Sequence, residues 1–329
     1  MVHDATSSRT GTIKFIALVL TVAGVLACLH LAAAALTIGR PTAKSANMCR
    51  NVSDRMALGK DMASPKLVLV GGSGVRAGLS AELMAKELDK NVLNFGLQAA
   101  LGPGLILGKT RQIVKEGDSV ILLLEYPQLS TDRWNPISVD LAMACGQEVL
   151  FGSGAASILE ALFAAGPRRL MTVFAGTAQA KASTQAHVNP YGDRNLESFP
   201  ALSQRDAARV DLYQPVPIGV DAASRGARAI AEFASWAKRR KINVYASWPN
   251  TIDHPVYQRS AGFEEIKRFY EGVGITFIDT PNKGLYPRAM FYDTQYHLTY
   301  EAIRMRTRAF VTAVKAAGVG SGETVAGAE

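Results

Sequence analysis

Cysteine is scarce in this sequence of 329 residues, which contains three. Cys28 lies in a long uncharged stretch, so Cys49 and Cys145 are the pair that remains for a disulfide in an oxidising compartment. The spacing of these residues does not fit a zinc site. The sequence leaves two alternatives open for Cys49 and Cys145, namely a disulfide bond or two buried free thiols.

Charged side chains are also few, at 19% of the residues, whereas 48% are hydrophobic. This balance excludes a wholly disordered chain and provides enough apolar material for one sizeable globular core. The formal net charge is +8, but no nucleic-acid recognition motif accompanies it, and the densest basic run, residues 238–241, closes a predicted helix. We therefore infer no nucleic-acid binding.

Charge is absent altogether from residues 15–39. An apolar stretch of this length predicts a transmembrane helix, and it is longer than the apolar region of a cleaved signal peptide. Small residues at 32–35 leave cleavage open as an alternative. We expect residues 1–14 to be a short N-terminal head, residues 15–39 a signal anchor and residues 40–65 a linker.

Basic residues flank both ends of this stretch, and by the positive-inside rule alone they favour a cytoplasmic domain. A short head followed by one helix nevertheless resembles a signal anchor, and a large following domain is translocated largely regardless of its charge. We therefore expect a single-pass protein of the inner (cytoplasmic) membrane, with its domain in the periplasm.

The rest of the chain alternates between short apolar runs and amphipathic segments. Buried strands are predicted at residues 66–70, 91–95, about 119–125, 242–247 and 275–279. Helices are predicted to begin after Ser80 and Asp221, at Pro103 and Gly262, and after Thr299. This order predicts an α/β fold, a doubly wound, flavodoxin-like α/β/α sandwich whose five parallel strands have the order 2-1-3-4-5 or a close variant of it.

We expect this domain to span residues 66–317. Periodicity is poor at about 130–220, which we interpret as an insertion containing one helix around residues 158–165. The Gly-rich tail, residues 318–329, is expected to be disordered.

Candidate site residues lie at or after the ends of the predicted strands, in the order Ser73, Asn94, Gly96, Gln98, Glu125, Tyr126, Trp248, Asn250, Asp293 and His297. Because the carboxyl ends of parallel strands meet at one edge of a sheet, we expect these residues to lie close together. A serine hydroxyl is a poor nucleophile until a base takes its proton, and the neutral imidazole of His297 suits that role. Asp293, from the same short segment, would orient the ring and stabilise the imidazolium.

A Ser directly after the first strand, an Asn-x-Gly after the second and an Asp/His pair before the last helix resemble blocks I, II and V of the SGNH (GDSL-like) hydrolase family. The similarity covers residues 66–315 in order. Residues 71–73, 94–102, 116–121 and 291–298 resemble bacterial envelope members with an N-terminal anchor, relatives of which esterify or de-esterify surface glycans.

The resemblance implies an SGNH-type domain that needs no metal or cofactor and works through an acyl-serine intermediate. It implies Ser73, Asp293 and His297 as catalytic residues, and the backbone N–H groups of Ser73 and Gly96 as the oxyanion hole. We take Asn94, Gln98, Glu125, Tyr126, Trp248 and Asn250 as candidates for substrate binding.

Three features depart from the family pattern. Three residues separate Asp293 from His297, whereas the family pair is Asp-x-x-His, and Gly74 replaces the polar residue that follows the nucleophile. The third strand ends in Glu125-Tyr126-Pro127 and lacks the family's Gly-x-Asn-Asp, so one donor of the oxyanion hole is unassigned.

Structural roles are an alternative for each of these side chains. Ser73 can cap a helix or turn, and His297 can be a histidine with purely structural hydrogen bonds. Glu125 can accept from a backbone group in the interior, and Trp248 can belong to the core.

The sequence favours an enzyme that transfers or hydrolyses O-acetyl or related acyl esters on an envelope glycan or exopolysaccharide. Its partners would be that glycan or acyl ester, the membrane, and a membrane protein that donates acyl groups. A non-catalytic SGNH-fold factor that binds or assembles polysaccharide is the alternative, and an esterase acting on lipids is a third. Sequence does not distinguish transfer to sugar from transfer to water.

Overall fold

The computed structural model describes residues 3–131, 135–152, 154–175, 188–194, 210 and 213–319. The chain forms two compact units. We call residues 1–46 with 134–180 the anchor unit, and residues 47–133 with 181–329 the sheet unit.

A five-stranded parallel sheet forms the centre of the sheet unit. Its strands are β1 (Lys66–Gly71), β2 (Asn91–Gly96), β3 (Ser119–Leu123), β4 (Asn243–Ser247) and β6 (Thr276–Ile278), in the order β2-β1-β3-β4-β6. All four pairings are parallel. The predicted positions and order of the five strands are therefore confirmed. Two further strands, β5 (Thr251–Ile252) and β7 (Leu285–Tyr286), form a small separate parallel pair.

The helices and 3₁₀ turns of the sheet unit connect these strands. They are α3 (Ser73–Arg76), α4 (Ala81–Leu88), η1 (Ala99–Leu101), α5 (Gly102–Thr110), η2 (Tyr126–Ser130), α11 (Arg225–Arg239), η5 (Pro255–Tyr257), α12 (Gly262–Gly272), η6 (Arg288–Met290) and α13 (Tyr300–Ala316).

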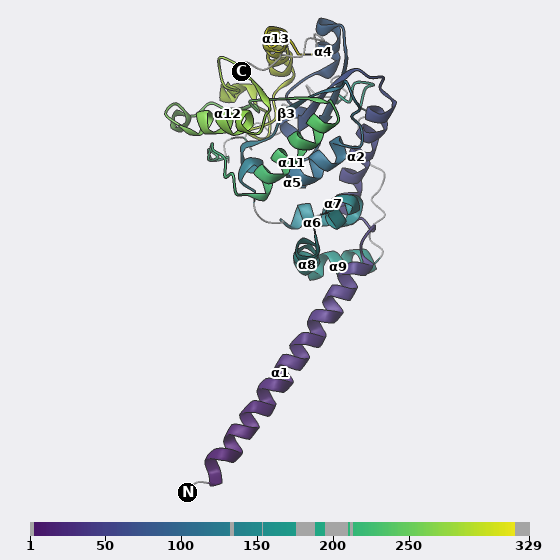
Figure 1. Ribbon diagram of the computed structural model, residues 1–329, viewed down its shortest axis with the longest axis vertical. Helices are drawn as coiled ribbons and strands as arrows, with labels where there is room; N and C mark the ends of the chain where they lie inside the picture. The colour runs from purple at the N-terminus through teal and green to yellow at the C-terminus, as the bar shows by residue number, and fades with distance from the viewer. Residues whose placement is uncertain are drawn as a thin grey trace. The chain divides into compact units, whose positions relative to one another are not determined.

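Helices cover both faces of the sheet (Figure 1). Leu67 and Leu69 of β1 pack in one cluster with Met84 of α4 and Phe310 of α13. Successive side chains of a strand point to opposite faces, so the alternate residues of β1 face the layer formed by α5 and α11, which pack on each other. All six residues of β1 are buried, which explains why the strand has a continuous apolar sequence instead of an alternating one.

Capping residues were predicted with mixed success. Ser80 caps α4 as expected, since its Oγ accepts a hydrogen bond from Leu83 N at 3.2 Å. Asp221 was a wrong assignment, because α11 begins four residues later and Ser224 is its N-cap. Ser224 is fully buried and accepts from Ala227 N, whereas Asp221 closes a preceding turn. Sequence alone did not separate two capping residues this close together.

The anchor unit begins with α1 (His3–Leu36), in which residues 11–36 are long and apolar enough to cross a membrane. It also contains α6 (Pro136–Cys145), α7 (Gln147–Gly152), α8 (Ala155–Ala164) and α9 (Pro167–Phe174). The sequence predicted one helix in this region, around residues 158–165, so three of the four were missed.

Residues 40–65, which we expected to be a linker, contain helix α2 (Ala43–Asp61). Cys49 and Cys145 are each disulfide-bonded, and Cys28 is free. Most of the tail expected to be disordered, residues 320–329, lies outside the described residues.

Candidate active site

Ser73 lies at the carboxyl end of the central strand β1, as the first residue of the short helix α3. Two glycines precede it because the chain passes close to other groups here. A Cβ on Gly71 would lie 2.5 Å from Leu123 O, and one on Gly72 would lie 2.7 Å from Glu125 Oε1. The glycines therefore let the serine turn sit directly against the end of β3.

Glu125 fixes the Ser73 turn through two hydrogen bonds. Its Oε1 accepts hydrogen bonds from Ser73 Oγ at 3.3 Å and from Gly74 N at 2.7 Å. Burial raises the pKa of the Glu125 carboxyl to about 6, although the bonds from Gly74 and Ser73 oppose this shift. Glu125 is thus both a partner of a backbone group and a direct contact of the candidate nucleophile.

His297 and Asp293 form a close pair. The two side chains meet with 2.7 Å between His297 Nδ1 and Asp293 Oδ1. An ionised Asp293 favours the tautomer that carries its proton on Nδ1, which leaves the lone pair on Nε2. Nε2 is buried and has no hydrogen-bond partner in the part of the chain that the structure describes. The ring therefore has one nitrogen oriented by a carboxylate and the other available to accept a proton.

Backbone contacts fix the His297 loop beside the Ser73 turn. Leu298 N donates to Ala77 O at 2.9 Å, which joins the residue after His297 to the residue that ends α3. Tyr296 Cβ would lie 3.6 Å from a Cβ on Gly74. The segments that carry Ser73 and His297 are thus in contact, as the sequence predicted. In this arrangement the Ser73 hydroxyl donates to Glu125, and no bond from it to His297 is formed.

Two arginines lie around His297. Arg194 donates to Tyr292 Oη at 3.3 Å, and the Tyr292 ring stacks on the His297 ring with 5.7 Å between centroids. Burial lowers the pKa of His297, Asp293 opposes this, and the positive charges of Arg76 and Arg194 lower it further. The imidazole is therefore held neutral at neutral pH, the form that a general base requires.

Sequence reasoning missed both arginines. Arg76 follows Ser73 by three residues on a one-turn helix, a spacing that places two side chains on one face, so the signal was present. Arg194 comes from the poorly periodic segment, where no pattern indicated its position.

The expected oxyanion donor Gly96 has another role. Its N–H donates to Asn94 Oδ1 at 3.0 Å, so it is not available to bind a substrate oxygen in this arrangement. A Cβ on Gly96 would lie 2.2 Å from Arg76 N, so the glycine allows the backbone of α3 to pack on β2. Ser73 N remains as the candidate donor, since the first N–H groups of a helix have no intrahelical acceptor.

Five of the six substrate-binding candidates, all but Gln98, are buried, and two of them, Asn94 and Asn250, support the site from within. Asn94 is fully buried and donates to Val75 O, Leu79 O and Asp193 Oδ1. Asn250 is also fully buried, and it donates to Tyr296 O at 2.7 Å, which holds the loop before His297.

Two further buried candidates, Trp248 and Tyr126, belong to the core. Trp248 packs edge to face on Phe263 and Phe277 and donates to Asp279, in agreement with the core alternative. Tyr126 is 1% exposed and also packs on Phe263. Of the remaining candidates, Gln98 is half-buried and Glu125 contacts Ser73 as described above.

Arg306 of α13 is a buried residue that sequence reasoning did not identify. It donates to Asn250 Oδ1 at 2.6 Å, to Gly78 O and to Trp248 O. Through these bonds the last helix supports both the segment after β4 and the turn after α3. Its spacing was the available signal, because it lies three residues after Ile303 and four before Phe310, both of which are buried.

Metal-ligating side chains do not gather at this site. No group of three or more His, Cys, Asp or Glu residues suited to a metal ion occurs among the residues that the structure describes. A surface pocket of about 310 Å³, lined by residues that include Asp253, Lys283 and Phe263, does not include Ser73 or His297.

No protein-family model, curated protein or solved structure matches the chain. Its function is therefore inferred from the residues of the site.

Proposed function

We propose that this protein is an SGNH-type enzyme that transfers or hydrolyses acyl esters on an envelope glycan through an acyl-Ser73 intermediate. One observation carries the proposal. His297 has Nδ1 on Asp293 and an unpartnered, buried Nε2, and its loop is bonded to the turn that carries Ser73. A purely structural histidine in the interior would use both ring nitrogens.

The proposed reaction has two balanced halves. Ser73 Oγ forms a bond to the acyl carbon of the donor ester, and its proton passes to His297 Nε2. The tetrahedral intermediate then releases the donor alcohol, which takes that proton. In the second half, a sugar hydroxyl or water gives its proton to Nε2 and attacks the acyl carbon, and Ser73 leaves as the restored hydroxyl.

Asp293 stabilises the imidazolium that forms in each half of this reaction. Rotation about the Cα–Cβ bond of Ser73 would redirect its hydroxyl from Glu125 towards His297. Glu125 would keep its second bond, to Gly74 N, and so hold the turn in place during that rotation.

We place the sheet unit in the periplasm and α1 in the inner membrane, as the signal-anchor resemblance implies. An anchored enzyme is suited to receive acyl groups from a membrane protein. Fusion of alkaline phosphatase, which is active only outside the cytoplasm, after residue 319 tests this orientation. An active fusion supports it, and an inactive but stable fusion excludes it.

A serine-directed fluorophosphonate probe tests the nucleophile. We expect the full-length wild-type protein to be labelled and S73A to lose the label. The matched control S235A changes an exposed serine on α11 and should be labelled like wild type. Labelling that persists in a folded S73A protein would contradict the assignment.

A non-catalytic polysaccharide-binding factor remains the second candidate, because of a specific observation. The Ser73 hydroxyl and the Gly96 N–H both have internal acceptors, Glu125 and Asn94. This candidate predicts no reaction with the probe but retained binding of polysaccharide by S73A. Profiling with acetylated sugars and short acyl esters then separates transfer from hydrolysis for an active protein.

A further inference from the structure

The C-terminal end of α1 packs within the helices of the anchor unit. Leu31, Ala34 and Ile38 lie in one apolar cluster with residues of α6, α7, α8 and α9, among them Met143 and Leu162. These helices therefore surround the part of the chain where the candidate membrane span ends.

Contact between α8 and α1 extends into the span itself. The Phe163 ring stacks on the His30 ring, with 6.3 Å between centroids and an interplanar angle of 19°. His30 precedes Leu36, the last residue of the apolar span, by six residues. At 1.5 Å per residue this places Phe163 about 9 Å along α1 from the end of the span. An interfacial helix buries its apolar face about 5–10 Å into the boundary between headgroups and acyl chains. The position of Phe163 along α1 falls within this range.

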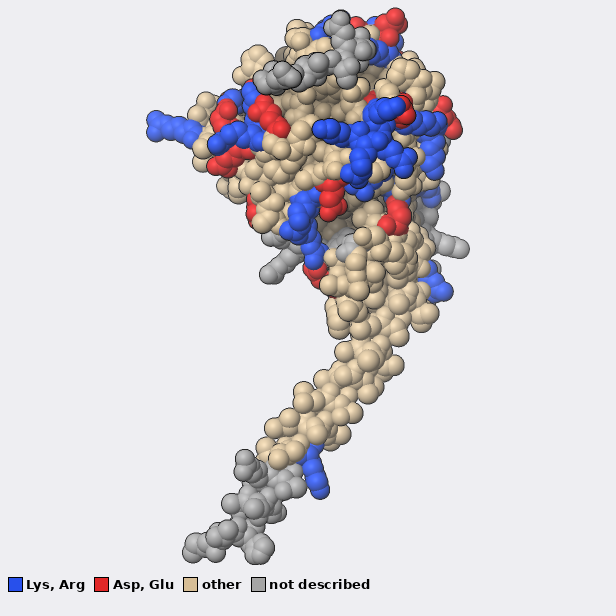
Figure 2. Space-filling model, viewed as in Figure 1, with Lys and Arg blue, Asp and Glu red and all other residues tan. Residues whose placement is uncertain are grey.

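Large apolar side chains on these helices are exposed. Phe151, Leu159, Phe163, Met171 and Phe174 are each between 49% and 66% exposed, and we call them the juxtamembrane surface. Figure 2 shows the corresponding region, where α1 meets α8 and α9, as mostly tan with few charged residues. An apolar patch of this kind on a protein marks an interaction site.

Sequence spacing places four of these side chains in two pairs, one pair on α8 and one on α9. Leu159 and Phe163 are four residues apart on α8, and Met171 and Phe174 are three apart on α9, so each pair lies on one helix face. Arg168 lies one turn before Met171 and is exposed. An arginine at this position can reach lipid phosphates while the apolar side chains enter the acyl region.

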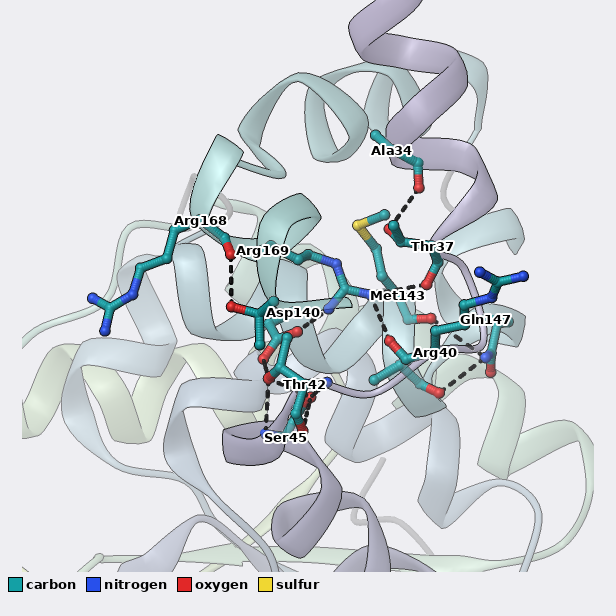
Figure 3. A network of polar contacts seen from close by, with 12 residues as sticks. Ala34, Thr37, Arg40, Thr42, Ser45, Asp140, Met143, Gln147, Arg168 and Arg169 are labelled. Carbon is teal, nitrogen blue, oxygen red and sulfur yellow. Dashed lines mark hydrogen bonds and ion pairs between the residues drawn. The ribbon is translucent and has the colours of Figure 1, made fainter. Parts of the chain in front are cut away.

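A buried polar network fastens these helices to the end of α1 (Figure 3). Arg169 of α9 pairs with Asp140 of α6 and donates to the carbonyl groups of Thr37 and Arg40, each at 3.0 Å. Thr42 Oγ1 donates to the other oxygen of Asp140 at 2.7 Å. Because the network joins α6 and α9 to the residues directly after the span, the helices cannot leave the level of the membrane surface while α1 remains inserted.

We propose that α7, α8 and α9 insert the juxtamembrane surface into the interface of the bilayer that α1 spans. The occupant of this apolar surface is lipid, because the surface is continuous with the span and lies at interfacial depth. The proposal rests on α1 as the anchor and is independent of the chemistry at Ser73.

Depth-dependent quenching in proteoliposomes tests the proposal. The background is full-length protein carrying C28A, with its disulfide intact. Into it we introduce one cysteine at a time, through F163C, F174C, M305C or L20C. Each new cysteine is labelled with an environment-sensitive fluorophore. Met305 is the matched control, an apolar side chain that is 44% exposed on α13 of the sheet unit. Leu20 reports on the middle of the span. Phosphatidylcholine with a fifth of phosphatidylglycerol provides the bilayer, doped with lipids that carry a nitroxide near the headgroup or deep in the acyl chain.

We expect the shallow nitroxide to quench the labels at positions 163 and 174 by about twofold or more, and aqueous iodide to quench them little. The label at 305 should respond only to iodide, and the label at 20 mainly to the deep nitroxide. Iodide quenching at 163 equal to that at 305 overturns the proposal while leaving the anchor intact. Protection at 163 from both quenchers also overturns it, because the surface is then covered by protein. Failure of the deep nitroxide to quench position 20 excludes the anchor and the proposal together.

Discussion

The two units differ in how their apolar side chains are divided between inside and outside. On α11 of the sheet unit, Ile230, Phe233 and Ala237 are buried and the basic residues at the helix end are exposed. On α8 of the anchor unit, Ala161 and Leu162 are buried, but Leu159 and Phe163 on another face are exposed and equally apolar. A helix whose other side meets water has an amphipathic sequence, whereas in our proposal the second apolar face of α8 meets lipid. Weak periodicity in the sequence therefore does not exclude helices, as α6, α7, α8 and α9 show.

In the proposed function the chemistry belongs to the sheet unit, and the largest effect should come from its histidine loop. We expect D293N to lower kcat on an acetyl ester by up to about ten-thousandfold, because the asparagine no longer holds the reactive tautomer of His297. The exposed D253N is the matched control and should retain full activity. Loss of kcat in both variants would indicate a general loss of structure instead.

The pH profile sharpens this assignment. Asp293 raises the pKa of His297 and Arg76 lowers it, so the two substitutions should move the acid limb of kcat/KM in opposite directions. D293N should extend its residual activity to lower pH, and R76Q should shift the limb to higher pH. Shifts in the same direction would contradict the proposed role of His297 as the base.

A buried ion pair at the start of the sheet should have the largest effect on stability. Lys66 Nζ lies 2.9 Å from Asp118 Oδ2, and both side chains are completely buried. D118A leaves the Lys66 charge unpaired in the interior, so we expect the free energy of unfolding to fall by about 3–5 kcal/mol. E116A removes an exposed pair with Lys241 and should cost at most about 1 kcal/mol. Urea unfolding in detergent, followed by tryptophan fluorescence, measures both.

The equivalent substitution in the anchor unit should have a smaller and more local effect. R169A removes a charged group that bonds to Asp140 and two carbonyl oxygens, and we expect a loss of about 1.5–3 kcal/mol. The exposed neighbour Arg168 provides the control variant R168A. Hydrogen exchange should quicken in α6 and α9 of R169A while the strands of the sheet unit remain unchanged. Faster exchange throughout the sheet would show that the two units unfold together.

The smallest effect should come from the protonation of Glu125. Its pKa is raised to about 6 from an ordinary value of 4.5, so the folded protein binds a proton that the unfolded chain has already released. The free energy of unfolding therefore falls by about 1–2 kcal/mol in total as the pH rises from 4.5 to 6. Above pH 6 this contribution no longer changes. E125Q should abolish this decrease, and E116Q should leave it unchanged. Thermal unfolding between pH 4 and 8 makes the comparison.

The sequence predicted the sheet well because buried parallel strands have continuous apolar runs, as in residues 66–70. The order of Ser73, Asn94, Glu125 and His297 along the chain also predicted which strand ends meet. Sequence did not predict which way a side chain points, so Asn94 and Asn250 were taken as substrate contacts although they are buried supports. Nor did it predict the contribution of Arg194 to the site. Its hydrogen bond to Tyr292 joins two irregular segments that are far apart in the sequence.

The hydrogen bond from Leu298 N to Ala77 O has a consequence for divergence of such sites. It joins two backbone groups of the same chain, so a side-chain substitution leaves both partners in place. The exception is proline at 298, which has no backbone N–H to donate. The separation of the serine turn and the histidine loop can therefore persist while the residues around them are replaced. Neighbouring side chains such as Arg76 and Gln98 can then be exchanged without removing this contact. The contact between the two segments then depends on the backbone and not on the identity of the side chains beside it.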